Sequence, residues 1–204
     1  MGTPSSLLVR LLRFANVLSL AGAWIGGALT LASVLLICFD ILVRKFLGFN
    51  TGGADELSGY AFAISISWAM AYVTLQRGNV RVDALYLRFP TRFTVFLDLL
   101  SLVIMGVFMA YLTCYASQVA GMSWEMGAAS NSLLGVPLWI PQGLWVIGFV
   151  WMCLVLALML VCASTALITG DVATIKALCG MRTLEEEASD EAEAGARIVE
   201  REKS

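Results

Sequence analysis

The sequence contains no histidine among its 204 residues, and only 14% of its residues are charged, against about 25% in soluble domains. Without histidine the chain lacks the commonest metal ligand, the usual haem ligand and the usual general base at neutral pH. Its cysteines are scattered and form no CxxC pair, so they give little support to a metal site or a disulfide. We therefore expect no cofactor, no bound metal and no enzymatic activity. The five cysteines are Cys38, Cys114, Cys153, Cys162 and Cys179.

Charge is also missing from long stretches of the chain, such as the 26 residues from Phe14 to Phe39. About 20 apolar residues in a helix cross a hydrocarbon core about 30 Å thick. The runs are continuous and do not alternate as barrel strands would. The sequence therefore predicts an all-α membrane protein with four transmembrane helices. The expected spans are about 17–39, 57–75, 93–117 and 142–165.

The two ends of the chain differ from this membrane domain, which we place at residues 14–170. Residues 1–13 are predicted to form a short cytoplasmic interfacial helix and not a signal peptide, because the apolar run that follows is too long and has no cleavage site. A second interfacial segment is predicted around Pro90. Residues 171–204 are predicted to be a cytoplasmic tail, which is acidic from Thr183 onwards and helical in part or disordered.

The distribution of lysine and arginine predicts the orientation, because positive residues near the spans favour the cytoplasmic side. The basic residues gather before the first span, between the second and third, and after the fourth. The loop between the third and fourth spans has none. We therefore expect both termini in the cytoplasm. The cytoplasmic set is Arg10, Arg13, Arg77, Arg81, Arg88, Arg92, Lys176 and Arg182.

The centres of the four expected spans carry no Asp, Glu, Lys or Arg, although such residues mark many transport and catalytic sites in membranes. A proton-coupled exporter, a haem anchor or an intramembrane protease would each need groups that are missing here. Gly22, Gly26 and Gly27 in the first span would instead let another helix approach closely. The pattern favours assembly with a partner over catalysis.

Three segments, "DILVRKFLG", "ADELSGYAFAISISWAMAYVTLQRGNVRVDAL" and "GVPLWIPQGLWVIGF", occur in this order. They contain an Arg that ends the first span, a Glu-Leu-Ser that opens the second, a basic-Gly turn that runs to Val-Asp, and a Pro-x-Trp-x-Pro before the fourth. In this order the chain resembles the small membrane subunit of TRAP (tripartite ATP-independent periplasmic) transporters, the DctQ-like family, over about residues 17–165. One departure is Asn79, where the family often has His, which indicates that proton chemistry is not needed there.

The resemblance implies a small accessory subunit in the bacterial inner membrane. It implies a large multi-span partner that carries substrate and sodium, and a periplasmic binding protein that delivers an organic acid. The small subunit would brace the large one without binding substrate, in contact with lipid and with no nucleic acid. A self-contained, homo-oligomeric small transporter or channel is the alternative.

We predict six residues that position the chain against its partner, two at the outer surface and four in the inner turn. For each of them a simpler role in topology or headgroup contact is the alternative, and for Arg77 and Arg81 it is an equal one. In the same turn, Gly78 is expected to permit a sharp exit from the second span. The six are Arg44, Glu56, Arg77, Asn79, Arg81 and Asp83.

Overall fold

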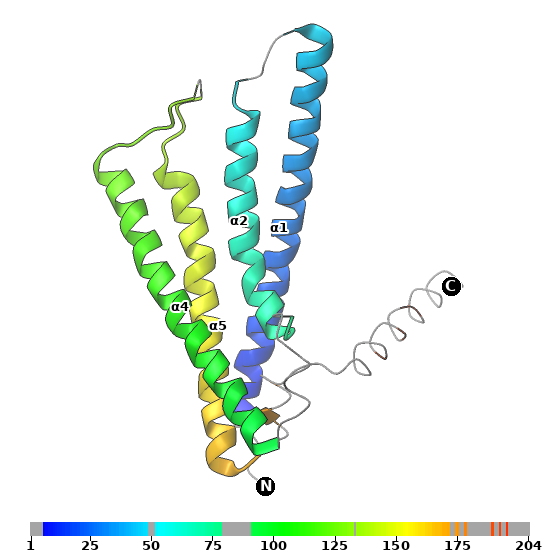
Figure 1. Cartoon of the computed structure of the whole chain (residues 1–204), viewed down its shortest axis with the longest axis vertical. Coiled ribbons are helices and arrows are strands. Elements are labelled where there is room, and N and C mark those ends of the chain that lie inside the picture. The colour runs from blue at the N-terminus through cyan, green and yellow to red at the C-terminus, as the bar shows by residue number, and fades with distance from the viewer. Residues whose placement is uncertain are drawn as a thin grey trace.

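The computed structural model describes residues 6–48, 52–78, 91–132 and 134–171, with six isolated positions beyond them. Four long helices run up and down in turn (Figure 1). All four are long and apolar enough to cross a membrane, which confirms the prediction of an all-helical fold with four spans. The helices are α1 (Ser6–Leu47), α2 (Ala54–Leu75), α4 (Thr91–Glu125) and α5 (Trp139–Thr169).

Helix α1 is much longer than its predicted span. Its 42 residues extend for about 63 Å, roughly twice the thickness of the hydrocarbon core. The helix has no break at Arg13, so the segment expected to form a separate interfacial helix is, from Ser6 onwards, the first part of α1. The interfacial position of this segment stays a prediction. The second expected interfacial segment lies mostly outside the described residues.

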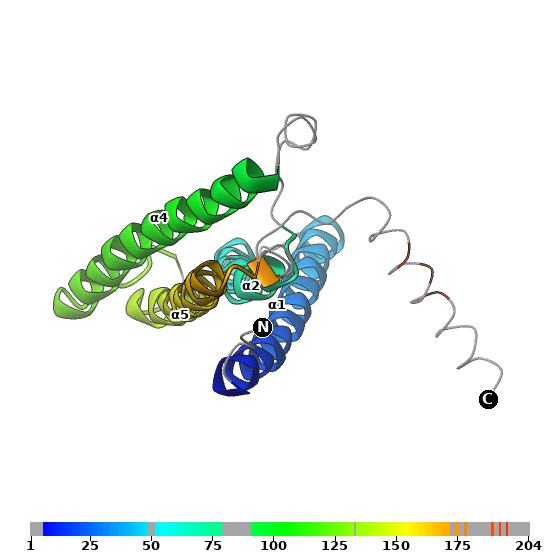
Figure 2. The same cartoon turned by 90° about the horizontal axis from the view of Figure 1, so that it is seen from below.

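The four helices form an open row in the order α4, α5, α2, α1 (Figures 1 and 2). Helix α2 packs against α1 on one side and α5 on the other, and α4 packs against α5. In a closed bundle the first and last helices would also meet. In this row α1 packs mainly on α2, with a few contacts to α5, and α4 packs mainly on α5, so each has an uncovered side among the described helices.

The α1–α2 contact follows small and buried residues that recur every three or four positions along α1. Such spacing keeps one line of a helix against its neighbour. A Cβ atom added to Gly26 would lie 2.8 Å from the backbone oxygen of Ser65, and one added to Gly22 would lie 3.1 Å from that of Trp68. The prediction of close helix approach is thus confirmed for Gly22 and Gly26, while Gly27 faces open space. The buried members of the line are Ala15, Ser19, Gly26, Ser33, Asp40 and Val43.

The α2–α5 contact joins the two halves of the molecule and is centred on Gly148. A Cβ atom there would lie 2.8 Å from the carbonyl carbon of Ser67 and from Cδ1 of Trp68. The indole of Trp68 donates a hydrogen bond of 2.9 Å to the backbone oxygen of Leu144 on α5. Only a residue without a side chain fits at position 148.

The main apolar core lies between α4 and α5. Met109 of α4 and Met152, Leu156 and Met159 of α5 are fully buried within it. Ala15 joins this cluster from α1, so the row is drawn together at the end of the molecule where α1 begins. Flexible methionine side chains fill irregular gaps between helices well.

The chain turns back under this core after α5. Gly170 adopts the left-handed conformation with φ 71°, which ends the helix. The Asp171 carboxylate then accepts hydrogen bonds from the backbone N–H and the hydroxyl of Thr174, at 3.1 and 2.6 Å. Ile175 is buried beside Val95 of α4. These contacts fix the beginning of the predicted tail against the membrane helices.

Candidate functional site

The loop between α4 and α5 folds back on itself at the end of the molecule where α1 ends and α2 begins. It opens at Gly127, with φ 58°, and Ala129 pairs with Pro137 as a short antiparallel bridge. The Ser130 N–H donates to the Val136 oxygen at 2.9 Å, and the Leu138 N–H to the Ala128 oxygen at 3.0 Å. This pairing holds the tip of the loop in a defined shape. We call residues 127–138 the outer loop.

The outer loop rests on the first turn of α2, which carries Glu56. Tyr60 donates a hydrogen bond of 2.5 Å to Oε1 of Glu56. The hydroxyl groups of Ser130 and Ser132, from the loop, also lie beside this carboxylate. Leu134 covers Gly53 so closely that a Cβ atom on Gly53 would overlap its side chain. The Glu56 carboxylate therefore lies where the outer loop meets α2, and its Oε2 atom has no hydrogen-bond partner among the described residues.

Arg44, the other residue predicted at this end, lies apart from that cluster. It occupies the last turn of α1, where its side chain is exposed together with that of Lys45. Asp40, one turn earlier, is buried on the side of α1 that faces α2. Arg44 is thus available at the surface, whereas Glu56 already has partners inside the chain.

At the opposite end, α2 ends in a Schellman motif. The Gly78 N–H donates to the Val73 oxygen at 2.9 Å, and the Arg77 N–H to the Thr74 oxygen at 3.0 Å. The left-handed residue is Arg77, with φ 57°, and not Gly78. The expectation that the conformational freedom of Gly78 permits the sharp turn was therefore wrong, because Arg77 adopts the left-handed conformation. Gly78 is needed because a Cβ atom there would lie 3.1 Å from Cγ1 of Val73.

The inner turn also joins α1 to α2. The side chain of Gln76 donates a hydrogen bond of 3.5 Å to the side-chain oxygen of Asn16. The other three residues predicted here, Asn79, Arg81 and Asp83, lie outside the described residues. Their role as positioning residues stays a prediction.

Sequence reasoning missed two buried acids, Asp40 on α1 and Asp98 on α4, which are 6% and 1% exposed. A signal was present in each case, because both lie on lines of buried residues with heptad spacing. Asp98 is the more deeply buried of the two. The structure places it inside the protein, at a position equivalent to its buried apolar neighbours. The line on α4 consists of Val95, Asp98, Leu102, Met109, Ala116 and Ser123.

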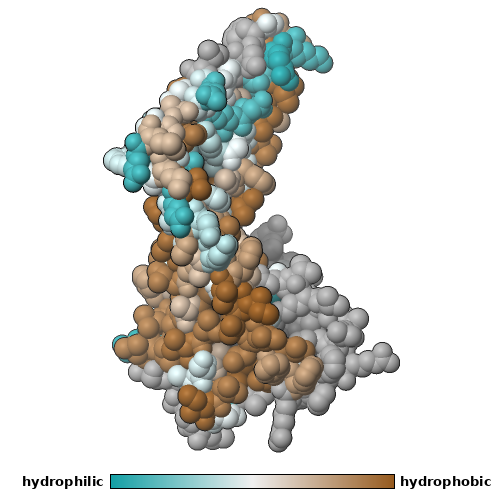
Figure 3. Space-filling view, turned by 60° about the vertical axis from the view of Figure 1, so that its left-hand side comes forward, coloured by the Kyte–Doolittle hydropathy of each residue, from teal (hydrophilic) through white to brown (hydrophobic). Residues whose placement is uncertain are grey.

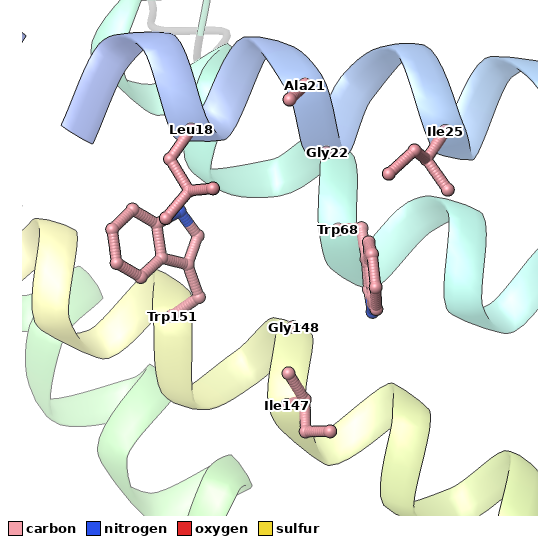
Figure 4. A pocket seen from close by; sticks show the side chains of 8 residues that line it. All are labelled: Leu18, Ala21, Gly22, Ile25, Trp68, Ile147, Gly148 and Trp151. Atoms are coloured by element: carbon pink, nitrogen blue, oxygen red, sulfur yellow. The ribbon is translucent and has the colours of Figure 1, made fainter. Parts of the chain in front are cut away.

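A groove of about 230 Å³ opens between α1, α2 and α5, as Figure 4 shows. The indole N–H groups of Trp68 and Trp151 are both used inside the protein, the second in a hydrogen bond of 2.9 Å to Ser19 Oγ. The surface of the groove is therefore almost entirely apolar. Such a surface can bind a lipid acyl chain but has no group that would bind a carboxylate. Its lining is Leu18, Ala21, Gly22, Ile25, Trp68, Ile147, Gly148 and Trp151.

Within the described part of the chain, no three His, Cys, Asp or Glu side chains gather where they could hold a metal ion. The free cysteines there lie singly on the helices, Cys38 and Cys114 exposed and Cys162 buried. The polar clusters at the two ends fix turns and loops. Among the described residues these clusters contain no nucleophile paired with a base.

The family described as tripartite ATP-independent periplasmic transporters, DctQ component, matches residues 33–166, about two thirds of the chain. This chain belongs to that family. It is therefore the small membrane component of a TRAP transporter, located in the inner membrane. Such transporters also work with a large membrane subunit and a periplasmic binding protein. No curated protein and no solved structure gives a significant match.

Proposed function

We propose that this subunit is a scaffold that braces the large membrane subunit of a TRAP transporter for an organic acid and sodium. The large subunit would bind both solutes, and this chain would bind neither. The observation that carries the proposal is the open row of helices. A row with unpaired apolar sides on α1 and α4 suits a brace laid against a larger membrane protein.

The distribution of polar groups supports this role. The face of the molecule in Figure 3 is apolar over its lower half, and its hydrophilic residues gather mainly in the upper half. The two polar clusters lie one at each end of α2. Their ionisable side chains, Glu56 and Arg77, lie near the ends of that helix. The groove beside Trp68 is apolar. A carboxylate or Na⁺ would find little to replace its water shell there.

We further propose that both termini and residues 79–90 face the cytoplasm and that the outer loop faces the periplasm. The up-and-down order of the helices places the start of α1 and the end of α5 on one side (Figure 1). The end of α2 and the start of α4 lie on that side as well (Figure 1), so the arginines of the segment between them would face the cytoplasm, as the positive-inside rule requires. Glu56 would then shape the periplasmic surface, and Arg77, Asn79, Arg81 and Asp83 the cytoplasmic one.

Two measurements on the same preparation test the function. The chain should co-purify with the large subunit of its transporter when both are expressed together. Proteoliposomes that contain both subunits, with the binding protein and a sodium gradient, should take up an organic acid, and vesicles with this chain alone should not. Uptake or ion conduction by this chain alone would overturn the scaffold role and support a self-contained transporter.

A further inference from the structure

Helix α1 presents a ridge of exposed apolar residues on the side away from α2. Their separations of three, four or seven positions place them on one line of the helix. Each is between 53% and 75% exposed. In Figure 2 α1 is the last helix of the row, with no other described helix beyond it on this side. The α1 ridge consists of Leu7, Phe14, Val17, Trp24, Leu31, Leu35 and Leu42.

The α1 ridge is too long for lipid tails to cover it. From Leu7 to Leu42 it extends for about 53 Å along the helix, against a hydrocarbon core of about 30 Å. Even at a tilt of 40°, the upper end of the usual range, it would span about 40 Å of membrane depth. Part of the ridge therefore leaves the hydrocarbon core, and there a protein partner covers large apolar side chains better than headgroups and water do.

The charges on the ridge identify the kind of partner. Arg10 and Lys45 lie on the same line at its two ends, and both are exposed. The only acid on α1 is Asp40, which is buried. A second copy of this chain would place basic groups against basic groups in either direction. The outer bases, Arg44 and Lys45, also oppose the positive-inside rule and so need an explanation other than topology.

We infer that the α1 ridge is the face on which an apolar helix of the large subunit packs, with a carboxylate of that subunit beside Lys45. The inference rests on the proposed function and names the contact surface. Ala21 and Ala28 lie on the same line and are exposed, so a partner helix can approach closely between the larger side chains. Paired charge at the outer end fixes the register of the two helices.

A bulky substitution on the ridge tests the packing. Ala28→Trp should lower co-purification with the large subunit by at least about tenfold, because added bulk is poorly tolerated in a packed interface. Ala110→Trp on α4, also exposed, is the matched control and should co-purify as the wild type does. Each variant alone should keep the wild-type melting temperature and elution volume, since both positions point away from the core.

The outcomes separate this inference from the proposed function. If the wild type does not bind the large subunit, the function itself is wrong. If the wild type and Ala28→Trp bind equally, or if only Ala110→Trp blocks binding, the function stands and the assignment of the surface to α1 is wrong.

The charge at Lys45 is tested in the same co-purification assay. Lys45→Glu should weaken binding of the large subunit about tenfold, and Lys45→Arg should retain it. Equal binding by Lys45→Glu would contradict the acidic partner.

Two native cysteines provide a readout that needs no substitution. Cys38 lies on the line of the α1 ridge, Cys114 lies on α4, and both are exposed. In the detergent-solubilised complex, labelling of Cys38 by a small thiol reagent should slow about tenfold relative to the isolated chain, whereas labelling of Cys114 should not. Equal labelling of Cys38 in both states would overturn the assignment.

Discussion

Helices α5 and α1 are both apolar along most of their length, yet the structure uses them differently. In the most apolar window of each helix, 44% of the residues of α5 are buried inside the protein, against 17% for α1. Helix α5 lies between two neighbours, and α1 lies at the end of the row.

The difference teaches that hydropathy does not decide burial in a membrane protein. Apolar side chains are as favourable in lipid as in the protein interior, so close packing and hydrogen bonds decide which helices meet. Helix α5 carries Gly148 and the indole of Trp151 toward its neighbours. Toward the ridge side, α1 carries large side chains that no other described helix covers.

The largest expected effect tests the close contact of α5. Gly148→Ala should lower the free energy of unfolding by about 2 kcal/mol, because its Cβ would meet the Ser67 backbone. Gly143→Ala, on the same helix with open space around it, should be neutral or stabilising by up to about 1 kcal/mol. Unfolding in mixed micelles, followed by circular dichroism, measures both. A neutral Gly148→Ala would show that α2 and α5 are not in close contact.

A pair of truncations compares the two helices directly. Met152→Ala on α5 should cost about 2 kcal/mol, at the lower end of core truncations, because lipid and core are similarly apolar and mainly packing is lost. Leu35→Ala on the α1 ridge should change the stability of the isolated chain by less than about 0.5 kcal/mol. The same unfolding assay applies. Equal costs would mean that α1 is covered in the isolated chain.

A substitution at the C-terminal end of α2 should change the free energy of unfolding by a smaller amount. Both α2 and α5 end with a left-handed residue, which is Arg77 in one and Gly170 in the other. A non-glycine residue in this conformation costs roughly 1 kcal/mol, so Arg77→Gly should stabilise the chain by up to that amount. If complex formation falls at the same time, the arginine side chain serves assembly. A loss of stability would show that the side chain contributes more to folding than the backbone strain costs.

The hydrogen bond from Trp151 of α5 to Ser19 of α1 should have a modest effect on stability. Trp151→Phe removes the donor to Ser19 and should cost about 0.6 kcal/mol, a typical value for such bonds inside membranes. Ser19→Ala removes the acceptor, and the double variant should cost no more than Trp151→Phe. Additive costs would show that the two side chains do not interact.

The contact of the outer loop is expected to affect local dynamics more than global stability. Glu56→Ala removes the acceptor that faces Tyr60, Ser130 and Ser132. Amide hydrogen exchange of residues 127–138 should become faster, while exchange within α5 stays unchanged. Unchanged protection of the loop would mean that its own backbone bridge is sufficient to hold it.

Much of this architecture could be predicted from the sequence because the relevant signals are local. Uncharged runs predict the four spans, and Gly22 and Gly26 predict a close helix contact. The spacing of Asp40 and Asp98 relative to the buried residues of their helices is also a local signal. The contact of the outer loop with the first turn of α2 could not be predicted, because Glu56 and Ser130 are far apart in the sequence. No local pattern indicates that Arg77 and not Gly78 adopts the left-handed conformation.

The sequence by itself determined that this is a four-span helical membrane protein and that it belongs to a transporter subunit family. Only the tertiary structure decided that the helices form a row, that Gly148 joins its halves and that α1 is left with an uncovered ridge. The physical reason is that entry into the bilayer depends on the hydropathy of consecutive residues. The order of helices depends instead on close contacts, such as Gly26 with Ser65 and Gly148 with Ser67, between segments that the sequence does not pair.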